Sequence, residues 1–416
     1  MSEKIVLAFS GGLDTSYCAL WLQHQGWEVH TVTIDTGGLN PVERQAIEAS
    51  AARAGVADHQ WIDARQELFD RFLRYLIFGN VLRGDTYPLC VSAERVCQAE
   101  AVARHALKLG AGALAHGSTG AGNDQIRFDV AFQALAPELE IHTPIRDQAL
   151  SRQQEVDYLA RHGIEISPET GTYSVNAGLW GTTVGGRETL ESWPELPESA
   201  YPSGEPAAGA DEYRELVIGF EQGVPVSLDG EPLDPVMLID EVASQAGHFG
   251  IGRGVHLGDT ILGIKGRVGF EAGAAHVLIA AHRELEKLVL SGKQLFWKRQ
   301  LGDLYGSLIH EGQAYDPLVT DLESFLASSQ GSVSGQVRLR LHPRAVAVLG
   351  VDSPHSLMDN NAAAYGEANH LWNGEDVRGF ARVFGVSQRI ARSAATKSPS
   401  DDEDESPVVK NRVLAS

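Results

Sequence analysis

The sequence predicts an α/β protein whose first part is a doubly wound parallel sheet. Over residues 1–165, short apolar runs alternate with amphipathic stretches of helical period, as in strands joined by crossover helices. The first apolar run, residues 5–9, is short enough for a buried parallel strand, and Ser10-Gly11-Gly12 follows it as a tight turn. Asp35 and His116-Gly117 also follow strands. Because ligands bind beyond the carboxyl ends of parallel strands, these three turns should converge on one crevice.

Local signals assign the strands and helices of this first part. Strand candidates are short apolar runs bounded by turn residues, and helix candidates carry apolar residues three and four positions apart. Pro41 stands near the first turn of one helix, and Ser151 caps another. The expected strands are 5–9, 28–34, 59–62, 113–115 and 140–143. The expected helices are one that starts around Thr15 and Ser16, then 41–54, 65–78, 93–109 and 151–162.

The composition changes near Ser167, and the rest of the chain predicts an α+β part that ends in a helix. Residues 188–212 are loop-like, and 213–229 predict a hairpin that turns at Glu221-Gln222-Gly223. Further strands are expected at 259–265, 332–341 and 345–349, and helices at 233–246, 274–290, 295–310, 316–327 and 376–394. The predicted domains are 1–165 for nucleotide binding, 166–372 for substrate binding and oligomerisation, 373–396 as a C-terminal helix, and 397–416 as an acidic disordered tail.

Composition limits the class of protein. The 416 residues exceed one typical domain, and the formal net charge of −21 argues against a broad nucleic-acid surface. No apolar run approaches the ~20 residues that span a bilayer, and residues 1–4 lead straight into a strand without a signal peptide. Cys18, Cys90 and Cys97 form neither a disulfide framework nor a metal-binding spacing. We therefore expect a cytoplasmic enzyme with no membrane or nucleic-acid partner.

The first turn carries the chemistry of a phosphate site. A glycine-rich loop between a strand and a helix N-terminus directs backbone N–H groups and the positive helix end at one spot. The hydroxyls of Ser10, Thr15 and Ser16 add donors. A plain strand-to-helix turn is the alternative, but the complete string S-G-G-L-D-T-S is more specific than two glycines. It is not the P-loop of kinases, because no Gly-Lys-Ser/Thr follows. It resembles the loop of the N-type ATP pyrophosphatases.

A second motif, HGSTGAGNDQIRFD at 116–129, follows a strand and opens a helix. It brings an amide, a carboxylate and a guanidinium, those of Asn123, Asp124 and Arg127, into little more than one helical turn. Asp124 and Arg127 could equally form a simple surface ion pair. Joined to AFSGGLDTS at 8–16 and YSVNAGLWG at 173–181, however, this motif resembles the argininosuccinate synthase family over residues 1 to about 395.

The resemblance implies a fold and an activity. The fold would be an adenine nucleotide alpha hydrolase-like domain followed by a synthetase domain. The activity would be the ATP-dependent condensation of citrulline with aspartate to argininosuccinate, in arginine biosynthesis. A citrullyl-adenylate would form first, and AMP and pyrophosphate would be released. The resemblance also implies Mg²⁺ bound with ATP, for which no protein ligand is identified, and a homotetramer in which residues 376–394 reach a neighbouring subunit.

The family's functional positions transfer residue by residue. ATP and pyrophosphate would contact Ala8, Ser10, Gly11, Gly12, Asp14, Thr15, Ser16, Ile34, Gly117 and Thr119. Citrulline and aspartate would contact Tyr87, Ser92, Thr119, Asn123, Asp124, Arg127, Ser174 and Thr183. Asp14, Asp124 and Arg127 are the candidate catalytic residues. None is a nucleophile, since the chemistry needs only positioning and charge stabilisation.

Several positions depart from the family pattern. Ala121 stands where a lysine is usual, and Cys90-Val91-Ser92-Ala93-Glu94-Arg95-Val96 replaces a GTSLARP-like stretch. A glutamate and a tyrosine that usually complete the citrulline site align with Gly258 and Phe270. Alternatives therefore stay open: an enzyme for an N-acylated citrulline, a non-catalytic nucleotide-binding relative, or a tRNA-thiolating or amide-forming relative. The acidic charge and the lack of a nucleophilic cysteine disfavour the last of these.

Overall fold

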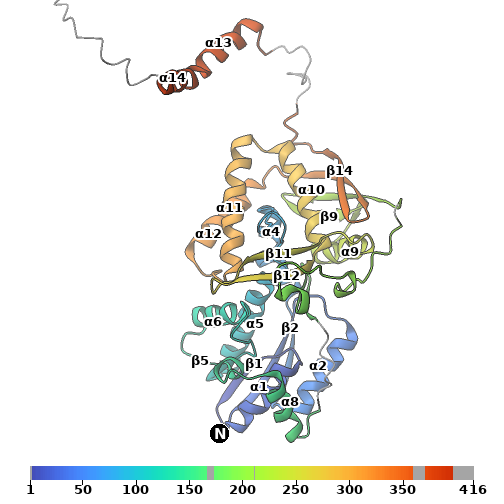
Figure 1. Ribbon diagram of the computed structural model, residues 1–416, viewed down its shortest axis with the longest axis vertical. Coiled ribbons are helices and arrows are strands. Elements are labelled where there is room, and N and C mark those ends of the chain that lie inside the picture. The colour runs from blue at the N-terminus through green and yellow to red at the C-terminus, as the bar shows by residue number, and fades with distance from the viewer. Residues whose placement is uncertain (1, 166–172, 210, 359–370, 397–416) are drawn as a thin grey trace, which may run out of the picture. The chain divides into compact units, whose positions relative to one another are not determined.

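The computed structural model describes residues 2–165, 173–209, 211–358 and 371–396 (Figure 1). The chain forms two compact units, Met1–Leu357 and Met358–Ser416, which are considered separately. The domain boundary expected at 165/166 falls beside undescribed residues and stays a prediction. The predicted acidic tail, 397–416, lies outside the described residues.

A five-stranded parallel sheet forms the first part of the larger unit, as predicted. Its strands are β1 (Lys4–Ala8), β2 (Glu28–Asp35), β3 (Asp58–Asp63), β4 (Ala113–Ala115) and β5 (Glu140–His142). Their order in the sheet is β3-β2-β1-β4-β5, and every neighbouring pair runs parallel. The chain thus winds outward from β1 in both directions, which places a crevice at the carboxyl ends of β1 and β4.

Successive side chains of β1 point to opposite faces of the sheet and therefore belong to two separate hydrophobic clusters. Ile5 and Leu7 face one cluster and Val6 faces the other, and all three are fully buried. The first cluster is covered by α1 (Leu13–His24), α2 (Pro41–Ala54), α7 (Pro144–Asp147) and α8 (Arg152–Arg161). The second cluster is covered by α5 (Ser92–Leu109) and α6 (Asp124–Leu135). The capping boxes at Asn40 and Ser151 fix the starts of α2 and α8.

The helix expected at 65–78 is interrupted by a π-helical turn. It runs as α3 (Arg65–Leu68), η1 (Phe69–Leu73) and α4 (Arg74–Phe78). Phe69, Phe72 and Leu73 in the π turn are all buried. The apolar periodicity correctly predicted a helical segment but did not reveal its change of period.

Two antiparallel sheets make up the second part of the larger unit. Their orders are β10-β9-β8-β13-β14 and β11-β12-β7-β6. The strands are β6 (Ser174–Gly178), β7 (Gly181–Gly185), β8 (Arg214–Glu221), β9 (Val224–Leu228), β10 (Glu231–Pro232), β11 (Arg253–Asp259), β12 (Lys265–Glu271), β13 (Gly335–His342) and β14 (Ala345–Asp352). The helices are α9 (Pro235–His248), α10 (Gly273–Val289), α11 (Gly292–His310) and α12 (Pro317–Ser329), with short 3₁₀ turns η2 (Arg187–Leu190) and η3 (Glu198–Ala200).

The strand expected at 259–265 is wrong, because residues 260–264 form the turn between β11 and β12 and only the two end residues belong to strands. Asp259 pairs with Lys265 at the end of the ladder, and their side chains form an ion pair of 2.7 Å. Gly263 has φ +81°, a left-handed conformation that closes the turn. The apolar residues of this stretch suggested a strand, yet Ile264 is exposed at the tip. In Figure 1 the β11–β12 ribbon lies between the parallel sheet and helices α10 to α12.

Two glycines join the parallel sheet to the second part. Gly37 and Gly38 follow β2 with φ of +92° and +80°. A Cβ at Gly37 would lie 2.8 Å from the backbone nitrogen of Leu179, and one at Gly38 would lie 2.7 Å from the backbone of Ala177. The N–H of Leu179 donates to the carbonyl of Thr36 at 3.0 Å. Larger residues would force the two backbones apart, which fixes β6 and β7 over the crevice.

Over residues 371–396 of the smaller unit, which the structure describes, two helices stand where the sequence predicted one over 376–394. They are α13 (Gly374–Phe384) and α14 (Val386–Ala395), and they meet at Gly385. Asn373 caps α13 through a capping box. Neither helix buries a residue, and their exposed apolar side chains include Val377, Phe380, Val383, Phe384 and Ile390.

A buried polar network stabilises the packing of α10 against α11 and α4. Lys298 lies 2.8 Å from Glu286, and both side chains are almost fully buried. The carboxylate also accepts hydrogen bonds from Asn80 and Gln330, at 2.6 and 3.1 Å. Burial lowers the pKa of Lys298, and Glu286 partly offsets this effect. Removing either charge would leave the other uncompensated inside the protein.

We predict that Lys298→Met lowers the free energy of unfolding by about 3–5 kcal/mol, because it leaves the Glu286 charge buried without its cation. Denaturant unfolding checks this value. Lys293→Met, at an exposed position of the same helix, is the matched control and should change stability little. Equal stability of the two variants would show that the pair does not stabilise the fold.

Candidate active site

The carboxyl ends of the parallel strands open into a cavity of about 710 Å³. Loops after β1, β2 and β4 line it, together with β6 and side chains from α5 and α6. The three turns predicted to converge therefore do so. Ten of the expected site residues line this cavity: Ala8, Ser10, Gly12, Asp14, Thr15, Ile34, Gly117, Thr119, Asp124 and Ser174.

The loop after β1 is held by its own hydroxyls. The N–H of Ser10 donates to Oγ1 of Thr15 at 3.4 Å, and the two hydroxyls lie 3.2 Å apart. Gly12 occupies the N-cap position of α1. Because glycine has no side chain to act as a cap, no side chain accepts a hydrogen bond from the first N–H groups of the helix. Such a helix start favours an anion such as a phosphate. Helix α1 begins at Leu13, two residues before the expected start.

Gly11 and Ser16 support this loop from behind rather than lining the cavity. Gly11 has φ +74°, and a Cβ there would lie 3.0 Å from Ile47 of α2. Ser16 is buried, and its Oγ lies 3.1 Å from that of Ser50. Ser50 in turn donates to the carbonyl of Gly11 at 3.1 Å. These two expected ATP-contacting residues thus hold the loop in place through α2.

The loop after β4 is anchored by a histidine. Nδ1 of His116 accepts from the N–H of Ser118 at 3.2 Å, so Nε2 carries the proton and donates to Asp129 at 2.9 Å. Arg146 binds the other oxygen of Asp129 at 2.6 Å. Burial alone would raise the pKa of Asp129, but the hydrogen bonds from His116 and Arg146 lower it. The carboxylate stays charged and orients the loop that carries Gly117 and Thr119.

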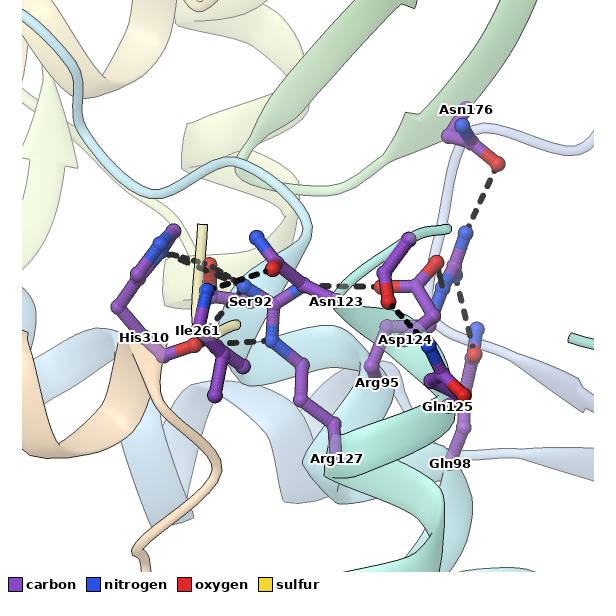
Figure 2. A network of polar contacts seen from close by, with 11 residues as sticks. Ser92, Arg95, Gln98, Asn123, Asp124, Gln125, Arg127, Asn176, Ile261 and His310 are labelled. Carbon is purple, nitrogen blue, oxygen red and sulfur yellow. Dashed lines mark hydrogen bonds and ion pairs between the residues drawn. The ribbon is translucent and has the colours of Figure 1, made fainter. Parts of the chain in front are cut away.

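Asp124 lies between two guanidinium groups at the start of α6 (Figure 2). Its Oδ2 accepts from Arg95 at 3.0 Å, and its Oδ1 accepts from Arg127 at 2.8 Å. Burial alone would raise the pKa of Asp124, but the two cations lower it, so the group is ionised. Arg95 also donates to Asn176 of β6 at 2.9 Å. The carboxylate thereby connects α5, α6 and β6 at the cavity wall.

Arg127 is turned toward the second part of the unit. Its Nε and Nη2 donate to the carbonyl of His310 at 3.0 and 2.8 Å, and Nη2 also donates to Ser92 at 3.1 Å. Burial, with Arg127 and Arg83 nearby, lowers the pKa of His310 to about 3, so this imidazole is neutral. Neither Ser92 nor Arg127 lines the main cavity. Asn123 is also outside it, and its Oδ1 accepts from the N–H of Ile261 at 2.9 Å.

The positions that depart from the family pattern are filled by rings. A Cβ at Gly258 would lie 2.5 Å from Nε2 of His256, so the His256 ring occupies the space of a side chain there. His256 stacks on Tyr87 with centroids 5.2 Å apart. Phe270 is buried, and its centroid lies 5.3 Å from that of Tyr87 and 5.9 Å from that of His276. Thr183 of β7 is buried opposite Phe270, away from the cavity.

Sequence reasoning missed several cavity residues: Thr36, Arg95, Gln98, Arg152 and Asn176. Arg95 donates to Gln98 at 3.1 Å, and Gln98 donates to Thr36 at 3.0 Å, which extends the network to the loop after β2. Two signals were available. Arg95 stands three residues after Ser92 on the same helix, and Asn176 lies within the motif at 173–181.

Glu94, also missed, is a fully buried carboxyl beside this network. Its Oε1 accepts weakly from the N–H of Trp180 at 3.5 Å, and Oε2 has no hydrogen-bond partner among the described residues. A Cβ at Gly178 would lie 2.0 Å from the carboxylate oxygens, so only glycine leaves room for Glu94. Burial raises the pKa of Glu94 to about 8, although Arg95 acts in the opposite direction. The carboxyl therefore retains its proton more readily than an exposed glutamate does near pH 7.

We predict that Gly178→Ala lowers the free energy of unfolding by about 1–3 kcal/mol because of overpacking against Glu94. The same change in a Glu94→Ala background should cost much less, since the clashing carboxyl is gone. A double-mutant cycle by denaturant unfolding measures this coupling. An equal cost in both backgrounds would show that Glu94 is not the obstacle.

Comparisons with known proteins cover both parts of the chain. The family model described as "Arginosuccinate synthase N-terminal HUP domain" matches residues 4–165, and "Arginosuccinate synthase C-terminal domain" matches 173–391. The chain is 37% identical to the argininosuccinate synthase of Xanthomonas axonopodis pv. citri over 402 residues, which cover 94% of each chain. It is 38% identical to that of Rubrobacter xylanophilus over 400 residues, 95% of this chain and 96% of the relative.

These matches extend across nearly the whole chain and agree with the site, where the motifs at 8–16, 116–129 and 173–181 meet at one cavity. The described residues contain no helix that is both long and apolar enough to cross a membrane. The protein belongs to the argininosuccinate synthase family.

Proposed function

We propose that this protein condenses citrulline with aspartate to form argininosuccinate, with conversion of ATP to AMP and pyrophosphate. The observation that carries the proposal is the convergence of the loops after β1 and β4 with Asp124 on one cavity. The cavity volume of about 710 Å³ suits a nucleotide together with part of a second ligand. The names of the relatives support the same reaction.

In the first step, ATP lies with its triphosphate on the loop of Ser10 to Thr15 and its adenine beside Ile34. The uncapped start of α1 and the hydroxyls of Ser10 and Thr15 stabilise the departing pyrophosphate. The ureido oxygen of citrulline attacks the α-phosphorus, and the bond between the α-phosphorus and the bridging oxygen breaks. Citrullyl-adenylate and pyrophosphate result.

In the second step, the amine of aspartate attacks the ureido carbon, and AMP leaves. Thr119, Asn123 and Asp124 hold aspartate, with the ionised Asp124 near its amino group. Arg127 binds citrulline after exchanging one of its present partners, Ser92 or the His310 carbonyl, for the substrate. Tyr87, Ser174 and Thr183 complete the proposed substrate contacts. The protein's contribution is positioning and charge stabilisation.

The described residues do not fit a resident metal ion. No group of three or more histidine, cysteine, aspartate or glutamate side chains in the described ranges could hold one. Mg²⁺ is therefore proposed to arrive on the phosphates of ATP, and no step is assigned to a protein-held ion. A soluble, cytoplasmic location is proposed with the same function.

We predict that pyrophosphate release requires both citrulline and aspartate, because ATP is cleaved only when the acceptor is activated. A coupled pyrophosphate assay that omits each substrate in turn checks this. N-acetylcitrulline provides a further comparison, and we expect kcat/KM to favour citrulline at least tenfold, or about 1.4 kcal/mol. Cleavage without either amino acid would indicate a different activity, and preference for the acetylated substrate would change the substrate class.

We predict that Asp14→Ala lowers kcat/KM for ATP by about 100-fold while the melting temperature stays close to that of wild type, because Asp14 lines the cavity and not the core. Steady-state kinetics and thermal unfolding measure the two effects. Asp157→Ala, at an exposed position of α8, is the control. Normal ATP turnover in Asp14→Ala would remove the loop after β1 from the ATP site.

We further propose a homotetramer in which α13 and α14 pack against a neighbouring subunit. The exposed apolar residues Val377, Phe380, Val383 and Phe384 would be covered there. We predict that Phe380→Ser with Phe384→Ser shifts the sedimentation coefficient toward smaller species, whereas deletion of residues 397–416 does not. A tetramer that survives the double substitution would show that these helices do not assemble it.

A further inference from the structure

Asp14, in the first turn of α1, has a second carboxyl group as a neighbour. Helices α1 and α8 lie side by side (Figure 1), and this packing brings the carboxyl of Glu155 on α8 close enough to that of Asp14 on α1 for the two groups to interact. Glu155 is only 2% exposed, and its Oε2 has no hydrogen-bond partner among the described residues. Asp14 lines the cavity, whereas Glu155 lies behind it.

Two carboxyl groups this close repel each other strongly when both are ionised, which favours the retention of a proton by one of them. The more buried group retains the proton more readily, because desolvation penalises its charged form. The charged or titratable groups that face Glu155 are Asp14, Tyr17 and Cys18 on α1 and Arg152 on its own helix. Arg152 is the one cation among them.

We propose that Glu155 is a positioning residue whose protonated carboxyl donates a hydrogen bond to Asp14 and keeps a single negative charge beside the triphosphate of ATP. The proposal rests on the proposed function only in taking this cavity as the ATP site. The hydrogen bond holds the Asp14 carboxylate in one orientation at the loop. The retained proton spares the phosphates a second adjacent anion, which would weaken ATP binding by repulsion.

The pKa of Glu155 determines the pH range over which the Asp14–Glu155 pair carries a single negative charge. Burial, the charge of Asp14 and the hydrogen bond with it raise the pKa of Glu155 to about 8, while Arg152 acts in the opposite direction. Below that pH the pair carries one charge, and above it two. If ATP binds only the protonated pair, its affinity should be about tenfold lower at pH 9 than at pH 7. A phosphate ester is already ionised near pH 7, so ATP itself contributes little to the change.

The test measures ATP binding to the full chain by isothermal titration calorimetry between about pH 7 and pH 9, with neither citrulline nor aspartate present. Glu155→Gln keeps a donor for Asp14 and cannot ionise, so its ATP affinity should match wild type near pH 7 and stay flat to pH 9. Glu155→Leu fills the same space without a donor, and its affinity should be reduced at every pH. Asp157→Asn, exposed on the same helix, should follow the wild-type profile.

A pH-independent affinity in wild type, or a Glu155→Gln profile that falls like wild type, would overturn the proposal. Full affinity in a folded Glu155→Leu protein would overturn it as well. If Glu155→Leu does not fold, the comparison of wild type with Glu155→Gln decides alone. The measurement does not depend on the ligation reaction: normal ATP binding without substrate-dependent pyrophosphate release would refute the proposed function and leave this inference standing.

Stability gives an independent readout of the same proton. The pKa of Glu155 is higher in the folded protein than its ordinary value, so between these two values the unfolded chain binds fewer protons than the folded one. The free energy of unfolding of wild type should therefore fall as pH rises from about 5 to 8, relative to that of Glu155→Gln. Parallel stability profiles of the two proteins would show that Glu155 carries no shifted proton.

Discussion

The ion pairs that place Asp124 between Arg95 and Arg127 are the constraint on which the site depends. The Asp124 carboxylate is partly buried, and two guanidinium groups from different helices match its charge. Arg127 then reaches the His310 carbonyl at the end of α11, and Arg95 reaches Asn176 of β6. Three segments far apart in the chain are thereby tied to the first turn of α6. A change at any member would move the wall of the cavity as well as the charge in it.

Buried carboxyls with raised pKa values form a second feature around this cavity. Glu94 lies beside the Asp124 network, and Glu155 lies beneath the loop of Asp14. Each has one oxygen without a donor among the described residues, and burial is the largest cause of each raised pKa. Carboxyls that keep a proton would limit the local negative charge at the proposed triphosphate site, in a chain whose formal net charge is −21. The acidic residues that line the cavity, Asp14 and Asp124, are thus fewer than the acidic residues nearby.

The sequence was most informative where local signals and function coincide. The strand–loop–helix order at residues 5–22 and the motif at 116–129 predicted both the sheet and the cavity, because glycines and cap residues at strand ends have few other uses. It was least informative where contacts are long-range. Three elements bring Arg95, Asn176 and Glu155 to the site. The spacing of residues along the sequence does not predict such long-range contacts. The turn at 259–265 was misread because its apolar residues stay exposed at a hairpin tip.

The region around Gly258 shows why aligned positions can mislead when taken singly. The missing side chain at Gly258 is matched by the ring of His256, two residues earlier on the same strand face. Burial and nearby Arg83 lower the pKa of His256, burial also lowers that of His276, and His310 is neutral. With Tyr87 and Phe270 these rings form an aromatic cluster beside Gly258, where the family pattern has a glutamate. Recognition of a charged substrate end would then depend on hydrogen-bond acceptors such as imidazole nitrogens and backbone carbonyls, which are weaker partners but need no buried counter-charge.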